Sequence, residues 1–251
     1  MYYEDWSHKI ADIISSFCEQ IKPLSEKIDV WEYHIKCELK KASEKLKPVR
    51  AFYILSDYQF TYWKPLSSDD IDILVSTDDI NGYLASKIED NSFIDYDEIF
   101  NEILSSDFIS TVDKALLQQS IEAMKKELFD LALVGIMVVI DDVLTNITND
   151  ATTSIGKRLR IIEKKLEDLS DEEWKEISDR DITVIGMYIT WTESLNAFNE
   201  HSNFNKPESE PQKLNRHWTL HGRKTDFANK LDCCKIINLL YGLICFGEET
   251  K

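Results

Sequence analysis

The chain has 251 residues, of which 43% are hydrophobic and 11% aromatic, enough for a folded core in one large domain or two small ones. Its formal net charge of −17 excludes a protein that coats nucleic acid without specificity, although a local phosphate site remains compatible with it. Seven glycines and five prolines are few for this length, which favours long helices over short strands joined by tight turns.

Several classes of protein are disfavoured by what the sequence lacks. No apolar run reaches about 18 residues, so we expect no transmembrane helix, and the first residues (MYYEDWSHK) lack the pattern of a signal peptide. The five cysteines are an odd number without a C-x-x-C pair, as in a protein with reduced thiols. Cys233 and Cys234 are adjacent, a poor spacing for sharing a metal. We therefore expect a cytoplasmic protein without membrane contact, metal or other cofactor.

Residues 1–111 are expected to form a helical N-terminal region of unknown function. Residues 3–47 carry apolar side chains at three- and four-residue spacing with a break near Pro23, which predicts two helices. Residues 50–63 (RAFYILSDYQFTYW) are aromatic and rich in β-forming types, so we predict a short strand or a buried extended segment. Residues 65–111 are acidic with scattered apolar residues, and we expect short helices with aspartates at their caps or first turns.

Residues 112–251 are expected to form a second, helical domain. Residues 113–149 predict the clearest helix, which becomes apolar on nearly every side between Leu131 and Ile140. Such a helix is typical of the centre of a core or of an oligomer interface. Two further helices and a loop are predicted over residues 155–169, 181–198 and 199–211.

A basic segment with two histidines, residues 214–224 (LNRHWTLHGRK), is the least ordinary feature of so acidic a chain. It contains two of the five histidines together with two arginines and a lysine. Gly222 is predicted to end a short helix that carries Arg216 through His221, and the last helix follows at about residues 227–245.

The residue types in this segment suit one reaction in particular. His217 and His221 are four residues apart and share one face of a helix. Arginine and histidine, without a carboxylate cluster or a glycine-rich phosphate loop, suit metal-independent RNA cleavage, in which the ribose 2′-OH attacks the adjacent phosphate. Histidine, with an ordinary pKa of about 6.5, can act as base and acid, and a guanidinium stabilises charge on the phosphate oxygens. Judged by spacing alone, these residues could equally cap helix ends and form surface ion pairs.

The string RHWTLH resembles the R-x4-H motif of the HEPN superfamily, small helical domains that include many ribonuclease toxins and anti-phage effectors. The longer string NRHWTLHG is similar to the Asn-Arg-His-x-x-x-His-Gly of bacterial Abi-like HEPN proteins, where a final helix rich in Leu, Ile and Lys follows, as it does here. The long helix at residues 113–147 looks like the first helix of these domains, with an acidic residue after an apolar run. The resemblance covers about residues 113–246.

The resemblance implies an all-α helical bundle that dimerises so that two motifs line one cleft. It also implies a metal-independent endoribonuclease acting in bacterial defence or in a toxin–antitoxin pair. Arg216 and His221 would be catalytic, with His217 assisting or positioning.

Five further residues are candidates for supporting roles. We add Asn215, Arg223 and Lys224 as RNA contacts because of their proximity and, for the two cations, their charge. Asp141 could orient an arginine or a histidine in the cleft, and Asp142 competes for that role.

The expected partners are RNA (tRNA or mRNA), a second copy of the chain, and an antitoxin or another defence protein. Two alternatives stay open. One is a non-catalytic HEPN module that serves dimerisation or nucleotide binding. The other is a helical interaction domain whose acidic face binds a basic partner protein.

Overall fold

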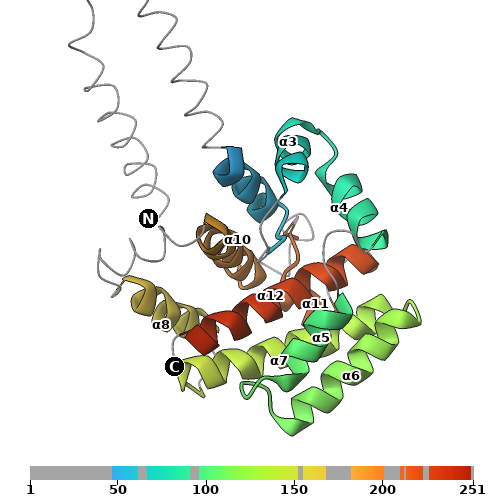
Figure 1. Cartoon of the computed structure of the whole chain (residues 1–251). Helices are drawn as coiled ribbons and strands as arrows, with labels where there is room; N and C mark the ends of the chain where they lie inside the picture. The colour runs from blue at the N-terminus through green and yellow to red at the C-terminus, as the bar shows by residue number, and fades with distance from the viewer. Residues whose placement is uncertain are drawn as a thin grey trace, which may run out of the picture. The chain divides into compact units, whose positions relative to one another are not determined.

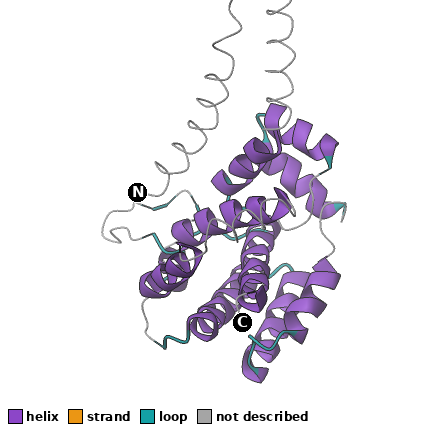
Figure 2. Cartoon of the chain, turned by 60° about the vertical axis from the view of Figure 1, so that its left-hand side comes forward, coloured by secondary structure: helices purple, strands orange, loops and turns teal. Residues whose placement is uncertain are grey.

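The structure is a computed structural model, and it describes residues 47–61, 67–90, 96–151, 155–167, 182–200, 210–211, 213–222 and 226–249. The two helices predicted within residues 3–47 lie outside this part of the chain, apart from Lys47 itself. Within the described ranges the protein is helical and contains no strand (Figure 2), so the prediction of an all-α fold is confirmed.

The described helices belong to a compact unit that runs from Pro48 to Lys251. Residues 48–57 form its first helical segment. The labelled helices follow in the order α3 (Ser68–Ser76), α4 (Ile80–Glu89), α5 (Tyr96–Ser105), α6 (Thr111–Lys125), α7 (Phe129–Thr148), α8 (Ile155–Glu167), α10 (Ile182–Phe198), α11 (Arg216–Leu220) and α12 (Lys230–Glu249).

Helix α7 is the centre of this unit. It packs against α6, α8, α11 and α12, while α12 also contacts α4, α5 and α10 (Figure 1). Met137, Val143 and Leu144 on α7 are completely buried. The helix is long and apolar enough to cross a membrane by length and composition, but its place in the core accounts for the same composition.

The helix predicted over residues 113–149 is two helices, α6 and α7, and the break between them carries no glycine or proline. Glu127 adopts a left-handed conformation with φ of 60°. The Glu127 N–H donates to Met124 O and the Leu128 N–H donates to Ala123 O, the hydrogen-bond pattern of a Schellman motif. The chain then reverses, and α6 packs so closely on α7 that a Cβ at Gly135 would lie 2.1 Å from the Ser120 hydroxyl oxygen.

The prediction of a strand or extended segment over residues 50–63 is wrong for most of its length, because the chain is helical to residue 57. Phe52 and Leu55 are buried and three residues apart, so they face the core from one side of a helix. Here the tertiary contacts outweigh the preference of aromatic residues for strands. The expected packing role is confirmed, since Phe60, just after the helix, is also fully buried.

The remaining helix predictions agree with the structure. The acidic region contains the short helices α3, α4 and α5, with Asp79 as the N-cap of α4 and Asp69 and Asp70 in the first turn of α3. Helices α8 and α10 cover the ranges predicted for them to within two residues at each end. The last helix starts later than expected, at Lys230, where Asn229 and Asp232 cap each other's backbone N–H groups.

Candidate functional site

The short helix α11 is fixed to the core from several directions. The Asn215 side-chain oxygen accepts hydrogen bonds from the backbone N–H groups of His217 and Trp218, and its amide nitrogen donates to Ala197 O and Glu200 O. Asn215 and Trp218 are each 3% exposed. These contacts hold the basic motif in a defined orientation although the helix is only five residues long.

The residue just before this cap is held as firmly. Gln59, which has a left-handed φ of 55°, accepts a hydrogen bond from Leu214 N and donates one to Leu214 O. The side-chain amide therefore pairs with the backbone as a neighbouring strand would. Through this contact the first helical segment of the unit positions the residues that lead into α11.

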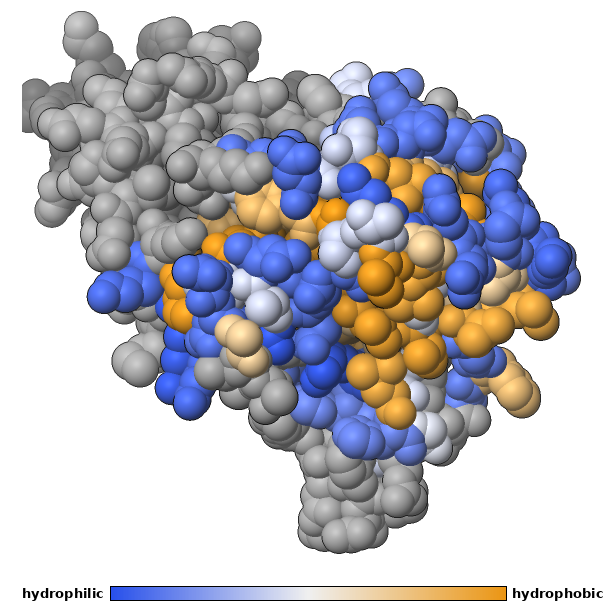
Figure 3. Space-filling model, turned by 90° about the horizontal axis from the view of Figure 1, so that it is seen from below, coloured by the Kyte–Doolittle hydropathy of each residue, from blue (hydrophilic) through white to orange (hydrophobic). Residues whose placement is uncertain are grey.

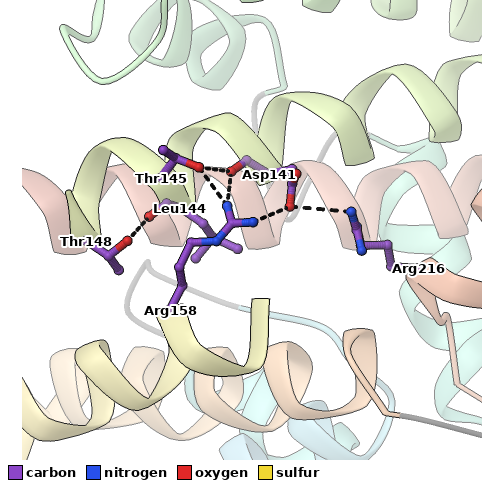
Figure 4. A network of polar contacts seen from close by, with 6 residues as sticks. All are labelled: Asp141, Leu144, Thr145, Thr148, Arg158 and Arg216. Atoms are coloured by element: carbon purple, nitrogen blue, oxygen red, sulfur yellow. Dashed lines mark hydrogen bonds and ion pairs between the residues drawn. The ribbon is translucent and has the colours of Figure 1, made fainter. Parts of the chain in front are cut away.

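A network of two arginines around one aspartate lies beside α11 (Figure 4). Arg216 Nη2 is 3.5 Å from Asp141 Oδ1, and Arg158 Nη2 is 3.0 Å from the same oxygen. Arg158 Nη1 also donates to Asp141 O at 2.5 Å and to Thr145 Oγ1 at 2.7 Å. One carboxylate thus faces two guanidinium groups, so the three side chains together carry one positive charge in excess.

Exposure distinguishes the two arginines. The Arg158 side chain is 1% exposed, whereas Arg216 is 19% and Asp141 35% exposed. Only Arg216 is therefore accessible to a ligand in solution. An ion pair of this length at a partly exposed position is worth no more than about 1 kcal/mol, so a phosphate can compete for Arg216.

Arg158 was not among the residues selected from the sequence. The sequence contains a weak indication of it. Arg158 is four residues before Ile162, which is buried on the apolar side of α8. A cation at that spacing occupies a position where the amphipathic pattern calls for an apolar residue. The partner could not be deduced, because Asp141 lies on another helix.

The structure separates the two aspartates that competed for a supporting role. Asp141 faces Arg158 and Arg216, whereas Asp142 accepts a hydrogen bond from Asn146 and lies beside Asp113 of α6. Burial, and after it the neighbouring Asp113 carboxyl, raises the pKa of Asp142 above its ordinary range. Successive helical residues point about 100° apart, which is why only one of the two reaches α11.

The two histidines of the motif face each other, with His217 partly exposed in the first turn of α11 and His221 exposed at its C-terminal end. The rings of His217 and His221 are nearly parallel, with centroids 6.5 Å apart and planes at 5°. His221 is the C-cap and Gly222 follows with φ of 62°, so the predicted end of the helix at this glycine is confirmed. Arg216 begins the same helix, and five residues of helical rise put its Cα about 7.5 Å along the axis from His221.

The arginine and the two histidines of the motif do not line the pocket that the described residues form beside α11. A pocket of about 620 Å³ borders α11, but its walls include Asn215, Trp218 and Thr219 and none of Arg216, His217 or His221. The arginine and the histidines therefore lie on a surface outside this pocket.

The three expected RNA contacts have different outcomes. The Asn215 side chain is buried and occupied by backbone groups, so it positions the motif instead of reaching outward. Arg223 and Lys224 lie outside the described residues. The predicted contacts of these two residues with RNA stay predictions.

An apolar stripe on α7 leads to this network. Leu131 is 63% and Val138 42% exposed, Val134 between them is partly exposed, and Asp141 continues the same face. At the start of the stripe, Leu128 and Leu131 line a shallow groove between α6 and α7. Figure 3 views the side on which α6 and α7 lie, and apolar surface is prominent on it.

Comparisons with family models, with curated proteins and with solved structures find no match for this chain. What can be said of function therefore depends on the geometry above and on the motif.

Proposed function

We propose that the protein is a metal-independent endoribonuclease of the HEPN type, acting in the cytoplasm of a bacterial cell in defence or in a toxin–antitoxin pair. One observation carries the proposal most directly. A partly exposed arginine, weakly held by a shared carboxylate, begins a five-residue helix that contains one of two stacked histidines and is capped at its end by the other. These are the groups that cleavage by the ribose 2′-OH needs.

Each residue has a definite part in this reaction. Arg216 binds the scissile phosphate and stabilises the charge that grows on its oxygens as the 2′-OH attacks. His221, exposed at the end of α11, accepts the proton of the attacking 2′-OH, and the imidazolium so formed gives a proton to the leaving 5′ oxygen. His217 supports His221 by stacking on it. The attack forms the 2′,3′-cyclic phosphate and expels the 5′ oxygen, which takes up a proton.

A second copy of the chain completes the site in this proposal. One motif on an open surface supplies no enclosing wall, and a concave site usually surrounds a reacting group. The apolar stripe Leu131, Val134 and Val138 adjoins Asp141, so two stripes packed together would bring two copies of Arg216 near each other.

The proposal is tested by incubating the purified protein with total tRNA and with mRNA in the presence of EDTA. We expect cleavage that leaves 2′,3′-cyclic phosphate ends and is lost in His221→Ala and Arg216→Ala. His201→Ala is the matched control, since it removes a histidine outside the motif and should cleave like the wild type. Cleavage that persists in both motif variants would refute the assignment.

The non-catalytic HEPN module is the second candidate. It is favoured by the position of the motif outside the pocket that borders α11. A well-folded dimer that binds RNA or nucleotides but cleaves no RNA offered to it would establish this alternative.

A further inference from the structure

Stabilisation of the fold does not account for the buried contacts of Arg158. Its guanidinium is buried and makes two bonds to Asp141 and one to Thr145, but its Nε has no hydrogen-bond partner within the described residues. A buried arginine paired to one carboxylate is a weak stabiliser, because the cost of removing the charge from water offsets the attraction. An apolar side chain at this place would serve the fold as well.

We propose that Arg158 is a positioning residue for Arg216 and acts through Asp141. This inference rests on the proposed function, in which Arg216 binds the phosphate of RNA. Arg158 cannot bind RNA itself, since its side chain is 1% exposed. Its effect reaches the surface through the single oxygen, Asp141 Oδ1, that both guanidinium groups share.

The sharing has two consequences for Arg216. Arg158 is anchored by the Asp141 carbonyl and the Thr145 hydroxyl, and from there it meets the carboxylate at 3.0 Å, whereas the contact of the same oxygen to Arg216 is longer, at 3.5 Å. Arg158 also neutralises the Asp141 charge, so the positive charge of Arg216 remains available to an incoming phosphate. Asp141 thus orients Arg216 without holding it in a closed ion pair.

Loss of Arg158 should therefore hold Arg216 more tightly in its ion pair with Asp141. In Arg158→Met the carboxylate has one cation left, and the pair between Asp141 and Arg216 should shorten and strengthen. A phosphate would then have to displace a full carboxylate. Adding Asp141→Asn to that variant removes the competing charge and should release Arg216 again.

The experiment compares four proteins, namely the wild type, Arg158→Met, Asp141→Asn and the double variant. The first measurement is the affinity for a single-stranded 2′-O-methyl oligonucleotide, which cannot be cleaved. The second is the rotation of the Arg216 guanidinium, followed by NMR of its Nη–H groups and assigned with Arg216→Lys. Lys157→Met is the matched control, since it removes an exposed charge from the neighbouring position of α8.

We expect Arg158→Met to slow the Arg216 rotation and to weaken oligonucleotide binding by about tenfold, as loss of a supporting partner does at other sites. The double variant should recover much of the affinity, and Lys157→Met should change neither measurement. A purely structural role predicts the opposite, because the double variant would then bind no better than Arg158→Met. That result, or an unchanged Arg216 spectrum in Arg158→Met, would overturn the inference.

Failure of the proposed function gives a different result. In that case the wild type does not bind the oligonucleotide at all, while the NMR measurement still reports whether Arg158 controls Arg216. Arg158→Lys covers the case in which the methionine variant does not fold. It keeps the charge but cannot make all three contacts, so it should slow the Arg216 rotation less than methionine does.

Discussion

The side-chain amide of Asn215 uses its whole hydrogen-bonding capacity inside the protein. Its two N–H groups donate to Ala197 O and Glu200 O, and its oxygen accepts from His217 N and Trp218 N. A side-chain amide offers two donors and two acceptor positions, so none remains for RNA. The residue that the sequence marked as a ligand contact is better understood as the cap that holds α11 in place.

Replacement of this cap gives a prediction that separates the two roles. Asn215→Ala should lower the free energy of unfolding by about 2 kcal/mol, because a helix cap is lost and the buried Ala197 carbonyl loses its donor. Urea unfolding followed by circular dichroism measures the change. Asn215→Asp keeps the acceptor and should fall between the two proteins. A variant of full stability that had lost only RNA binding would support a direct contact instead.

The role of a residue could be predicted from the sequence when it depends on neighbouring residues, and could not when it depends on contacts with distant ones. Gly222 was predictable because a glycine after a short helix is a local signal that depends on nothing else in the chain. Asp141 could not be separated from Asp142 without knowing how α7 is rotated in the core. Arg158 was not predicted at all, because its role depends on the carboxylate of Asp141, which is 17 residues away on another helix.

At the scale of helices, the sequence predicted where helices occur better than where they end. The break between α6 and α7 depends on Glu127 in a left-handed conformation. A glycine or an asparagine at this position would have indicated the break in the sequence, because these residues adopt that conformation most readily. The aromatic segment after residue 50 suggested a strand because strand preference is decided by the surface against which a side chain packs. In this protein that surface belongs to other helices.

The contact between α6 and α7 gives a prediction about pH. Burial, and then the Asp113 carboxyl, raises the pKa of Asp142. Below the ordinary aspartate pKa of about 3.9 this group is protonated in both states and destabilises nothing. As the pH rises from there through the raised pKa of the folded protein, the folded state loses stability relative to the unfolded one. Asp142→Asn lacks this loss, and its amide oxygen can still accept from Asn146.

Thermal unfolding between about pH 3 and pH 7 tests this sign. The melting temperature of Asp142→Asn should approach that of the wild type at the acidic end and exceed it increasingly toward neutral pH. Asp78→Asn removes an equal charge from an exposed loop position and serves as the control. A difference that shrinks as the pH rises would show that Asp142 stabilises the folded protein in its charged form.

At the scale of the whole molecule, the motif lies on an open surface and the apolar stripe of α7 lies next to it. The stripe does not by itself prove a dimer, since single exposed apolar residues are common. The stripe lies on the same face of α7 as Asp141, which contacts Arg216, and it therefore links dimer formation to the proposed RNA cleavage site. If the stripe is the interface, a charge placed on it must abolish assembly and activity together.

Val138→Glu is the variant that tests this connection. It should remain helical by circular dichroism but sediment as a monomer and cleave no RNA, because burying an unpaired carboxylate in the interface costs several kcal/mol. Val112→Glu places the same charge on α6 at a position that is 78% exposed, and should leave assembly and cleavage intact. If Val138→Glu were an active monomer, the stripe would not be an interface that activity requires.

Mixing two inactive variants then decides whether the site is shared between copies. Arg216→Ala and His221→Ala should each be inactive alone. After equimolar unfolding and refolding together, about half of the dimers carry one chain of each kind, since the interface treats the two alike. If one cleft takes its arginine from one chain and its histidine from the other, these mixed dimers retain one of each and cleavage returns. If cleavage stays absent although sedimentation shows dimers, one arginine and one histidine from different chains do not make an active site.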